Sequence, residues 1–283
     1  MIVDLHVHTT CSDGSYTPEQ IVALAHKQGL SLVALTDHDE YCAYDQVKEI
    51  PKDLVLLRGA EFSSTYKHRD VHILAYGYDI GCEKLVNYVQ FYKTERRSRI
   101  KKMTERCAAN GYKVSYEELV QQFGETTSLG RPHLSRLLIQ KGYVKTISQA
   151  FETILSPQSL CYVPKFSASP ADVVTLIHDA GGFAVLAHPV LIKNDTYVKE
   201  LLDLPFDGVE VYHPKQQGQL EKKYLAMAQE RGLLVSGGSD FHGVPDRYPQ
   251  TLGEFKIPLK PLLPLLQALA LPEDILDWAQ EAR

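Results

Sequence analysis

The sequence predicts an α/β protein whose parallel strands close into a barrel, and two observations support this fold class. Short apolar runs alternate with amphipathic helical segments along most of the chain, an order that is typical of a parallel sheet. Histidine, aspartate and glutamate residues stand at or just after the ends of these runs. Because ligands from many strands can meet only at one end, their repetition favours closure into a barrel.

The first strand is predicted within residues 1–9. Its residues alternate as in a strand, so His6 and His8 point to the same face. Two neighbouring imidazoles on an extended strand make half of a metal site, although one such pair is a weak signal. The signal gains weight because similar residues recur at the ends of later strands.

A helix and six further strands follow. Thr17 suits the helix N-cap and Pro18 its first position, while Gly29 ends the helix. The further strands are predicted at residues 30–35, 54–57, 71–76, 183–187, 208–212 and 233–236. Later helices are predicted at residues 169–180, 198–204 and 219–230. A polar stretch with helical character is expected up to Lys52, and a loop with a last helix from residue 259 onward.

The alternating pattern breaks between about residues 82 and 163. No strand run there ends in a candidate ligand, and helical signals dominate. A long helix is predicted from Glu83 to Asn110, closed by Gly111, with shorter helices at residues 116–123 and 131–141. We therefore expect a barrel domain made of residues 1–81 and 164–283, with residues 82–163 as a small inserted helical domain over the active site.

The composition is that of an ordinary globular protein: of 283 residues, 44% are hydrophobic and 23% are charged. The formal net charge of -5 argues against strong nonspecific nucleic-acid binding, although it allows a local basic patch. No apolar run approaches the roughly 18–20 residues of a membrane helix, and a core strand beside Met1 leaves no room for a signal peptide. The five scattered cysteines lack a C-x-x-C pair, so we expect free thiols in a reducing cytoplasm.

Ten of the eleven histidines divide into two groups, and the remaining one, His213, belongs to neither. Those on predicted helices or in polar loops favour a structural or exposed role: His26, His68, His133 and His178. Those at strand ends accompany carboxylates and favour metal ligation; with these carboxylates the set is His6, His8, Asp13, His38, Glu61, His72, His188, Asp240 and His242. This set is too large for one ion, so two or three divalent ions are expected, and the lack of thiolates favours Mn²⁺, Fe²⁺ or Zn²⁺ over a structural zinc site.

Such a cluster of ions indicates hydrolysis. Divalent ions can lower the pKa of a bridging water and neutralise a phosphoryl group as charge builds in the transition state. The expected activity is therefore that of a metal-dependent phosphatase or phosphodiesterase acting through a metal-bridging hydroxide. Hydrolysis of an amide or a lactone is the chemical alternative.

The motifs that carry these residues resemble the PHP (polymerase and histidinol phosphatase) superfamily. They are DLHVHT at 4–9, DG at 13–14, TDHD at 36–39, GAEF at 59–62, VHIL at 71–74, GRPH at 130–133, AHP at 187–189 and SDFH at 239–242. Their order and spacing look most like the TrpH/YciV-type branch of small phosphoesterases. The resemblance covers nearly the whole chain, and together the motifs are very specific.

The resemblance implies a distorted (β/α)7 barrel with a trinuclear metal centre. It implies one ion held by His6, His8, Glu61 and Asp240, a second held by Glu61, His72 and His188, and a third held by Asp13, His38 and His242. None of these positions departs from the pattern, which implies an active enzyme. Relatives of this branch look like nucleoside 3′,5′-bisphosphate phosphatases and 5′→3′ exonucleases acting on short RNA, so a small nucleotide or short oligonucleotide is the expected partner.

Four further residues are candidates for substrate contact. His213 ends the sixth strand outside the filled metal shells, so we expect it to contact a substrate phosphate or protonate the leaving oxygen, completing a catalytic set with Asp240 and His242. Arg96 and Arg99 lie within the apolar stripe of the long helix, and a buried guanidinium needs an anionic partner. That partner is either a carboxylate of the barrel or a substrate phosphate. We predict that one of these arginines, together with Arg131, grips the non-scissile phosphate.

Two other functions stay open at this stage. A histidinol-phosphate phosphatase would use the same scaffold and the same centre. A non-catalytic, metal-stabilised module that binds nucleic acid or a protein would be favoured by loss of ligands, and none is lost. A large insertion suits a substrate with more than one phosphate better than a compact amino alcohol phosphate. We expect a monomer.

Overall fold

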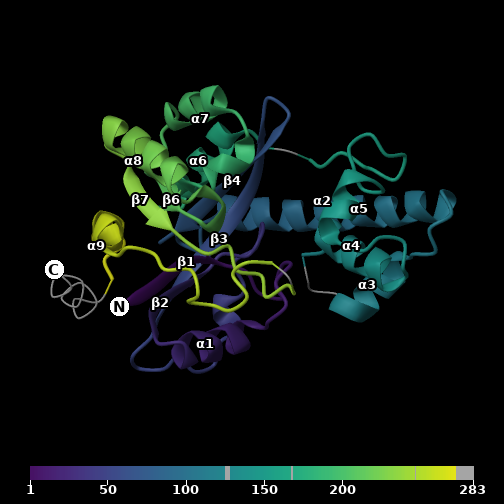
Figure 1. Cartoon of the computed structure of the whole chain (residues 1–283), viewed down its shortest axis with the longest axis horizontal. Coiled ribbons are helices and arrows are strands. Elements are labelled where there is room, and N and C mark those ends of the chain that lie inside the picture. The colour runs from purple at the N-terminus through teal and green to yellow at the C-terminus, as the bar shows by residue number, and fades with distance from the viewer. Residues whose placement is uncertain (125–127, 167, 246, 272–283) are drawn as a thin grey trace.

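A computed structural model describes residues 1–124, 128–166, 168–245 and 247–271. Within these residues the strands form one seven-stranded sheet whose spatial order follows the chain (Figure 1). The strands are β1 (Ile2–Val7), β2 (Leu30–Leu35), β3 (Val55–Tyr66), β4 (Arg69–Tyr76), β5 (Phe183–Leu186), β6 (Gly208–Tyr212) and β7 (Leu234–Gly237). All seven predicted strands are therefore present, and the mixed α/β class is confirmed.

The two ends of the sheet meet where β1 approaches the chain after β7. Val7 and Phe241 form a parallel bridge, and the His8 amide donates to the Phe241 carbonyl at 2.9 Å. Gly238 lies against β1 so closely that an added Cβ would stand 2.1 Å from the Cβ of His6. Only glycine fits at this contact. The closure brings the first and last metal-ligand motifs of the sequence to one rim.

One part of the predicted topology is wrong, because β4 runs antiparallel to both of its neighbours. Strand β3 continues to Tyr66 and β4 begins at Arg69, so Lys67 and His68, both with positive φ, make a tight turn. A parallel connection needs about a dozen residues or more, and two residues allow only a hairpin. The reversal means that His72, near the start of β4, faces the same rim as residues near the ends of the other strands.

Helices surround the barrel (Figure 1). They are α1 (Pro18–Lys27), α6 (Pro170–Asp179), α7 (Asp195–Leu202), α8 (Gln219–Arg231) and α9 (Leu263–Ala268). The predicted Thr17 cap is confirmed as a capping box with Gln20. The polar stretch before Lys52 forms only one 3₁₀ turn, η1 (Tyr44–Gln46). The predicted C-terminal helix lies partly outside the described residues, which end at 271.

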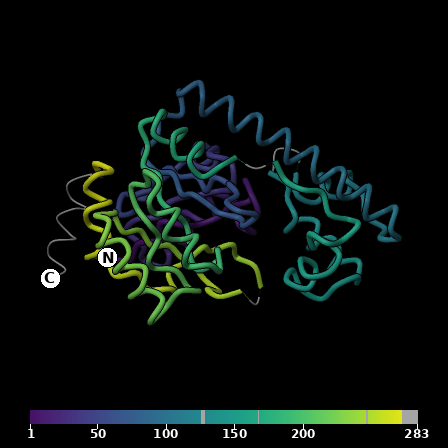
Figure 2. The backbone as a smooth tube through the Cα atoms, turned by 90° about the horizontal axis from the view of Figure 1, so that it is seen from above, coloured from purple at the N-terminus to yellow at the C-terminus, as the bar shows by residue number. Residues whose placement is uncertain are grey.

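Helices α2 (Glu83–Ala109), α3 (Tyr116–Phe123), α4 (Arg131–Gln140) and α5 (Ile147–Glu152) make up the helical unit; α5 was not predicted. Helix α2 belongs to two cores. Leu85 and Val89 pack in the barrel core, whereas Ile100, Met103 and Cys107 pack in a second core with α3 to α5. Figure 2 shows α2 running from the barrel into the helical unit. The cores thus divide within α2, and the domain boundaries at 81 and 164 stay a prediction.

Several other expectations concern single features. The five cysteines are free thiols. No helix in the described part of the chain is long and apolar enough to cross a membrane. His26 and His178 form ion pairs on the outside of the barrel, with Asp53 and Asp207 respectively. His133 is buried at the start of α4, where its Nδ1 accepts a hydrogen bond from the Gly130 amide. These histidines lie outside the cluster of candidate ligands.

Candidate metal centre and active site

All nine predicted metal ligands come together at the barrel rim. Strand β1 supplies His6 and His8, and the loop after it supplies Asp13. Glu61 lies in β3 and His72 in β4. The remaining four residues follow β2, β5 and β7: His38, His188, Asp240 and His242. Burial is deep, since most of these side chains are less than a tenth exposed, and only His38 and His72 are partly open.

Glu61 is the centre of the cluster and is fully buried. Five imidazole nitrogens lie within 3.4 Å of its two carboxylate oxygens, those of His6, His8, His38, His72 and His188. Its Oε1 lies 2.8 Å from His188 Nε2, and its Oε2 lies 2.9 Å from His38 Nδ1. A carboxylate whose two oxygens face different sets of imidazoles has the arrangement of a bridging ligand.

A second carboxylate group adjoins the first. His242 Nε2 lies 3.2 Å from Asp13 Oδ1, while His242 Nδ1 and His8 Nε2 each lie 3.3 Å from Asp240 Oδ1. Three sets of residues have donor atoms close enough to hold an ion together: His8, Asp13, His38 and His242; His6, His8 and Glu61; and His38, Glu61 and His72. The third set contains His38 where the family resemblance implies His188, so the detailed assignment of ligands to ions stays a prediction.

The donor atoms fit divalent cations. Glu61 Oε2 and His38 Nδ1 are buried, face each other at 2.9 Å, and lack hydrogen-bond geometry with any described group. His6 Nε2 and His8 Nε2 face each other at 3.2 Å, and two imidazole nitrogens at this distance need a shared proton or cation between them. Nitrogen and oxygen donors without thiolate suit Mn²⁺, Fe²⁺ or Zn²⁺.

The charge state of the cluster agrees with this fit. Burial alone would raise the pKa of Glu61, but the imidazoles of His38, His72 and His6 hold that pKa well below its usual value. Burial would lower the pKa of His8, but hydrogen bonds to Asp240 and Glu61 raise it to about 9. Without a cation the centre therefore binds protons, and a metal ion that takes their place releases them.

Carboxylates behind the ligands hold them in place, and sequence reasoning missed their role. Glu210, fully buried in β6, accepts from His6 Nδ1 at 3.0 Å and from the His188 amide at 2.8 Å. A glutamate inside an otherwise apolar strand was the available signal. Asp37 accepts from the Thr9 amide at 2.9 Å and from Ser12 Oγ at 2.5 Å, which fixes the loop that carries Asp13. Such partners set the orientation of the ligands and tune the metal.

The backbone is strained at two ligand positions. His188 has φ 23° and Asp240 has φ 52°, both in the left-handed region that non-glycine residues seldom adopt. The surrounding hydrogen bonds hold these conformations, as the amide of His188 donates to Glu210. Strain of this kind gathers at functional sites, where the fold determines the conformation.

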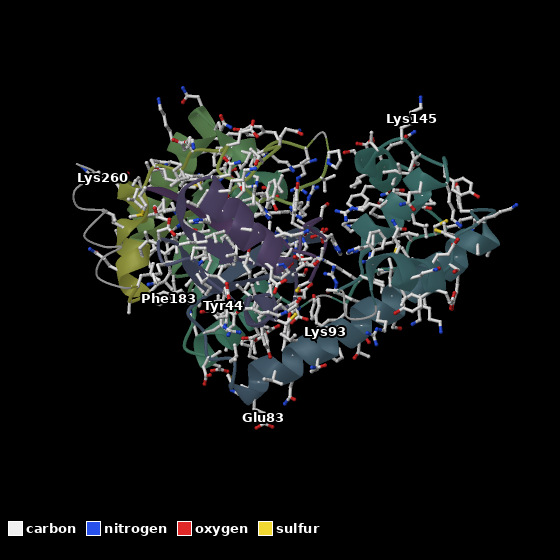
Figure 3. All side chains as sticks on the ribbon, turned by 90° about the horizontal axis from the view of Figure 1, so that it is seen from below. Tyr44, Glu83, Lys93, Lys145, Phe183 and Lys260 are labelled. Atoms are coloured by element: carbon white, nitrogen blue, oxygen red, sulfur yellow. The ribbon has the colours of Figure 1, made fainter. Side chains whose placement is uncertain are left out.

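A cavity of about 410 Å³ opens over the centre between barrel and helical unit. Seven of the nine candidate ligands line it, whereas His6 and His8 are fully buried and do not. Seven basic side chains also line it: Arg96, Arg99, Arg131, Arg136, Lys165, Lys215 and Arg247. Lys93 of α2, which Figure 3 labels, forms an ion pair with the buried Glu40, and this contact ties the helix to the barrel. Sequence reasoning missed Arg136, Lys165, Lys215 and Arg247.

The two arginines of α2 have different partners. Arg96 Nη1 lies 2.7 Å from Oδ2 of Asp39, a buried carboxylate that follows β2, so the barrel-carboxylate alternative is the observed one for Arg96. Arg99 donates from Nε to the Val163 carbonyl at 2.8 Å and lies over the Tyr162 ring. Its Nη2 is buried and has no hydrogen-bond partner in the described chain. Arg96 Nε is likewise buried without a partner in the described chain, but Asp39 already balances the charge of Arg96. Of the two arginines, Arg99 is therefore the better placed to meet a phosphate.

The other predicted substrate residues differ in access. Arg131 lines the cavity, lies over the Phe151 ring at 4.7 Å, and is 3.6 Å from Asp70. His213 is 2% exposed and does not line the cavity. Its Nδ1 accepts a hydrogen bond from the Lys215 amide, so the proton lies on Nε2, which faces Asp240 Oδ2 at 3.6 Å. His213 thus stands behind Asp240, and this position is at odds with the predicted direct contact with substrate.

The fold and the centre define a (β/α)7 barrel with a buried histidine–carboxylate metal-binding site at one rim. Comparison with known proteins agrees. The PHP domain model matches residues 4–157, so the chain belongs to the PHP domain family.

Two curated relatives span most of the chain. A 5′-3′ exoribonuclease of Haemophilus influenzae is 31% identical over 84% of this chain and 89% of its own length. A 3′,5′-nucleoside bisphosphate phosphatase of Chromobacterium violaceum is 31% identical over 85% of this chain and 87% of its own length. A solved structure, described as a metal-dependent phosphoesterase from Bifidobacterium adolescentis, superposes with a TM-score of 0.79 at 32% identity, covering 88% of this chain and 91% of that one.

Proposed function

We propose that this protein is a metal-dependent phosphoesterase that acts on small nucleotides carrying more than one phosphate. Its substrates would be nucleoside 3′,5′-bisphosphates or short 5′-phosphorylated oligoribonucleotides. The observation that carries this proposal is the union of two features in one cavity: a histidine–carboxylate centre on its floor and basic side chains on its walls. The names of the relatives, an exoribonuclease and a bisphosphate phosphatase, support it.

The nine candidate ligands would hold a trinuclear centre of Mn²⁺, Fe²⁺ or Zn²⁺, with Glu61 as the bridge between ions. When bound, such ions lower the pKa of a water molecule and neutralise the charge that builds on a phosphoryl group. The chain supplies the geometry. Glu210 and Asp37 fix the ligands from behind, and the closed barrel keeps the donor atoms of distant motifs within reach of one another.

Arg99, Arg131 and Lys165 would hold the non-scissile phosphate. Arg99 offers an unused buried Nη2. Burial, and to a lesser degree the neighbouring Arg131, lower the pKa of Arg99 to about 10. Lys165 lies 2.8 Å from Asp70, which is the anion that now shares this wall. A phosphate brings more negative charge than one carboxylate, and the guanidinium fork matches its oxygens. Arg96 would act through Asp39 and shape the wall.

Asp240 and His242 would act as ligands, and His213 would act as a positioning residue. The Nε2–H of His213 points at Asp240 Oδ2, while Arg247 Nη2 contacts the same oxygen at 2.5 Å. Together they leave Oδ1 directed at His8 and His242. The reaction consumes one water, breaks the ester P–O bond, and leaves the proton on the departing oxygen.

The proposal extends to the domain organisation, the oligomeric state and the cellular compartment. The active site would lie between a barrel domain, residues 1–81 and 164–283, and a helical domain, residues 82–163. The protein would act as a monomer. The five free cysteines support a reducing cytoplasm.

Histidinol-phosphate hydrolysis is less well supported. A single phosphate over the centre would leave the wall formed by Arg99, Arg131 and Lys165, here called the arginine wall, without a substrate anion. A non-catalytic module is also disfavoured, since all nine candidate ligands are present and assembled.

One assay tests the proposal. Phosphate or nucleotide release would be measured with added Mn²⁺ from adenosine 3′,5′-bisphosphate (pAp), 5′-AMP, short 5′-phosphorylated RNA and histidinol phosphate. We expect pAp or short RNA to show a kcat/KM far above that of 5′-AMP, because the remote phosphate supplies binding energy in the transition state. Equal kcat/KM for pAp and 5′-AMP would contradict the bisphosphate assignment, and fast histidinol phosphate turnover would establish the alternative.

A further inference from the structure

The cavity has a second basic wall, on the barrel side. Lys215 and Arg247 line the cavity beside Asp240, in the segments that follow β6 and β7. Lys193, which follows β5, lies close enough to Lys215 to affect its charge. The first wall, with Arg99, Arg131 and Lys165, lies instead beside Asp70 and His72. The two walls thus lie beside different ligands of the metal centre, one beside Asp240 and the other beside His72.

Lys215 is held in place by rigid structure. It belongs to the 3₁₀ turn η3 (Pro214–Gln216), and its amide donates to His213 Nδ1 at 3.1 Å. The next residue, Gln216, is fully buried and donates from Nε2 to the carbonyls of Glu210 and Val211 at 2.6 and 2.8 Å. These contacts tie the turn to β6, the strand that supplies Glu210. The backbone of Lys215 therefore has a fixed distance to the metal centre.

The charges on this wall lack a sufficient counter-charge. Burial lowers the pKa of Lys215, and the neighbouring Arg247 and Lys193 oppose its charge further, while Asp240 favours it. Asp240 already faces His8, His242 and Arg247. Neither Lys215 nor Lys193 forms an ion pair within the described residues. Three converging cations repel one another, and an anion placed among them would relieve that repulsion.

We infer that Lys215, supported by Arg247 and Lys193, forms a second phosphate subsite beside Asp240, for the strand that continues beyond the scissile phosphate. This inference rests on the proposed function and sharpens it. With the 5′-phosphate on the arginine wall and the scissile phosphodiester over the ions, the next phosphate of the strand reaches Lys215. A mononucleotide fills only the first wall and the centre, whereas an oligoribonucleotide fills both walls. The structure thus favours oligoribonucleotides of at least two nucleotides with a further phosphate.

A matched pair of substrates isolates this subsite. The 5′-phosphorylated dinucleotides pApA and pApAp share the same scissile bond and differ only in the 3′-phosphate of the second nucleotide. We expect the Mn²⁺-loaded protein to show a kcat/KM about tenfold higher for pApAp, the size of a good charged contact to phosphate. In Lys215→Ala the ratio of the two kcat/KM values should fall to near one. Lys222→Ala, which removes an equal charge from α8 outside the cavity lining, should keep the wild-type ratio.

A second measurement does not depend on turnover. Calorimetric titration of the metal-free protein with pApA and with pApAp should give the tighter binding for pApAp, and Lys215→Ala should abolish the difference. Equal affinities in the wild type, or a ratio that survives in a folded Lys215→Ala variant, would overturn the subsite. Loss of all hydrolysis, pAp included, with the binding difference intact would instead count against the proposed phosphoesterase.

Discussion

The floor and the walls of the cavity hold their polar groups in different ways. On the floor, Glu61 and most of the ligand histidines are buried, and carboxylates such as Glu210 and Asp37 fix the ligands from behind. On the arginine wall, Arg99 and Arg131 lie over aromatic rings and keep partial exposure. The floor is set before any substrate arrives, which suits the chemistry common to a family. Arg99 and Arg131 offer charge that no buried carboxylate balances among the described residues, which suits the choice among substrates.

The largest effect is expected from Glu61→Gln. The substitution removes the charge that faces five imidazoles, so the protein should lose bound metal and on the order of a thousandfold in kcat/KM. Elemental analysis after Mn²⁺ loading and phosphate release from pAp measure the two losses. A metal-loaded variant with wild-type turnover would show that Glu61 is not a bridge. Circular dichroism of the variant checks that the fold is kept.

We expect a smaller loss of metal affinity from Glu210→Gln, because Glu210 contacts ligands of the centre and is not a candidate ligand itself. Gln can still accept from His6 or from the His188 amide, but not with a charge, so metal affinity should fall by about 10–100-fold. Competition with a fluorescent chelator measures the affinity. Glu230→Gln, at the end of α8 on the outside of the barrel, is the matched control and should bind metal as the wild type does. Equal affinity in the two variants would mean that the buried layer does not tune the centre.

A substitution in the arginine wall should change the preference of the enzyme among substrates. In Arg99→Ala, kcat/KM for pAp should fall about tenfold more than kcat/KM for a small aryl phosphate, since only pAp carries the remote phosphate. The difference should appear mainly in KM. Lys102→Ala, on an exposed face of the same helix, serves as the control. If both substrates lost the same factor, Arg99 would belong with the floor and the distinction between the two regions would fail.

The last prediction concerns the stability of the helical unit and not the activity. Burial lowers the pKa of His133 to about 4, so the folded protein keeps this side chain neutral. Between about pH 6.5 and pH 4 the unfolded chain takes up a proton that the folded chain resists. The free energy of unfolding should therefore fall as the pH drops through this window, by about 3 kcal/mol at most.

Urea unfolding with EDTA present, at several pH values, measures this contribution. His133→Gln keeps a side chain that can cap α4 but cannot titrate, so its stability should depend less steeply on pH than that of the wild type. Identical slopes in the two proteins would show that His133 does not stay neutral in the fold.

Much of the fold and of the centre could be predicted from the sequence, because both rest on local patterns. Strands, caps and ligand motifs each lie within a few residues, as at Thr17 and at His6 with His8. The reversal of β4 was missed because the true turn, Lys67-His68, carries neither glycine nor proline. The roles of Glu210 and Asp39 were missed because their partners, His6 and Arg96, come from distant parts of the chain. The sequence pattern indicates which side chains lie on a strand, but not which side chains from other elements they contact.

Helix α2 has a mechanical consequence. Its 27 residues form one continuous helix, whose first part packs in the barrel core and whose last part packs in the second core. A hinge between the two units would have to bend or break this continuous helix, which favours a cavity of constant width. The protein can then select substrates by length. The spacing between the two basic walls, rather than the closing of a lid, decides how many nucleotides fit.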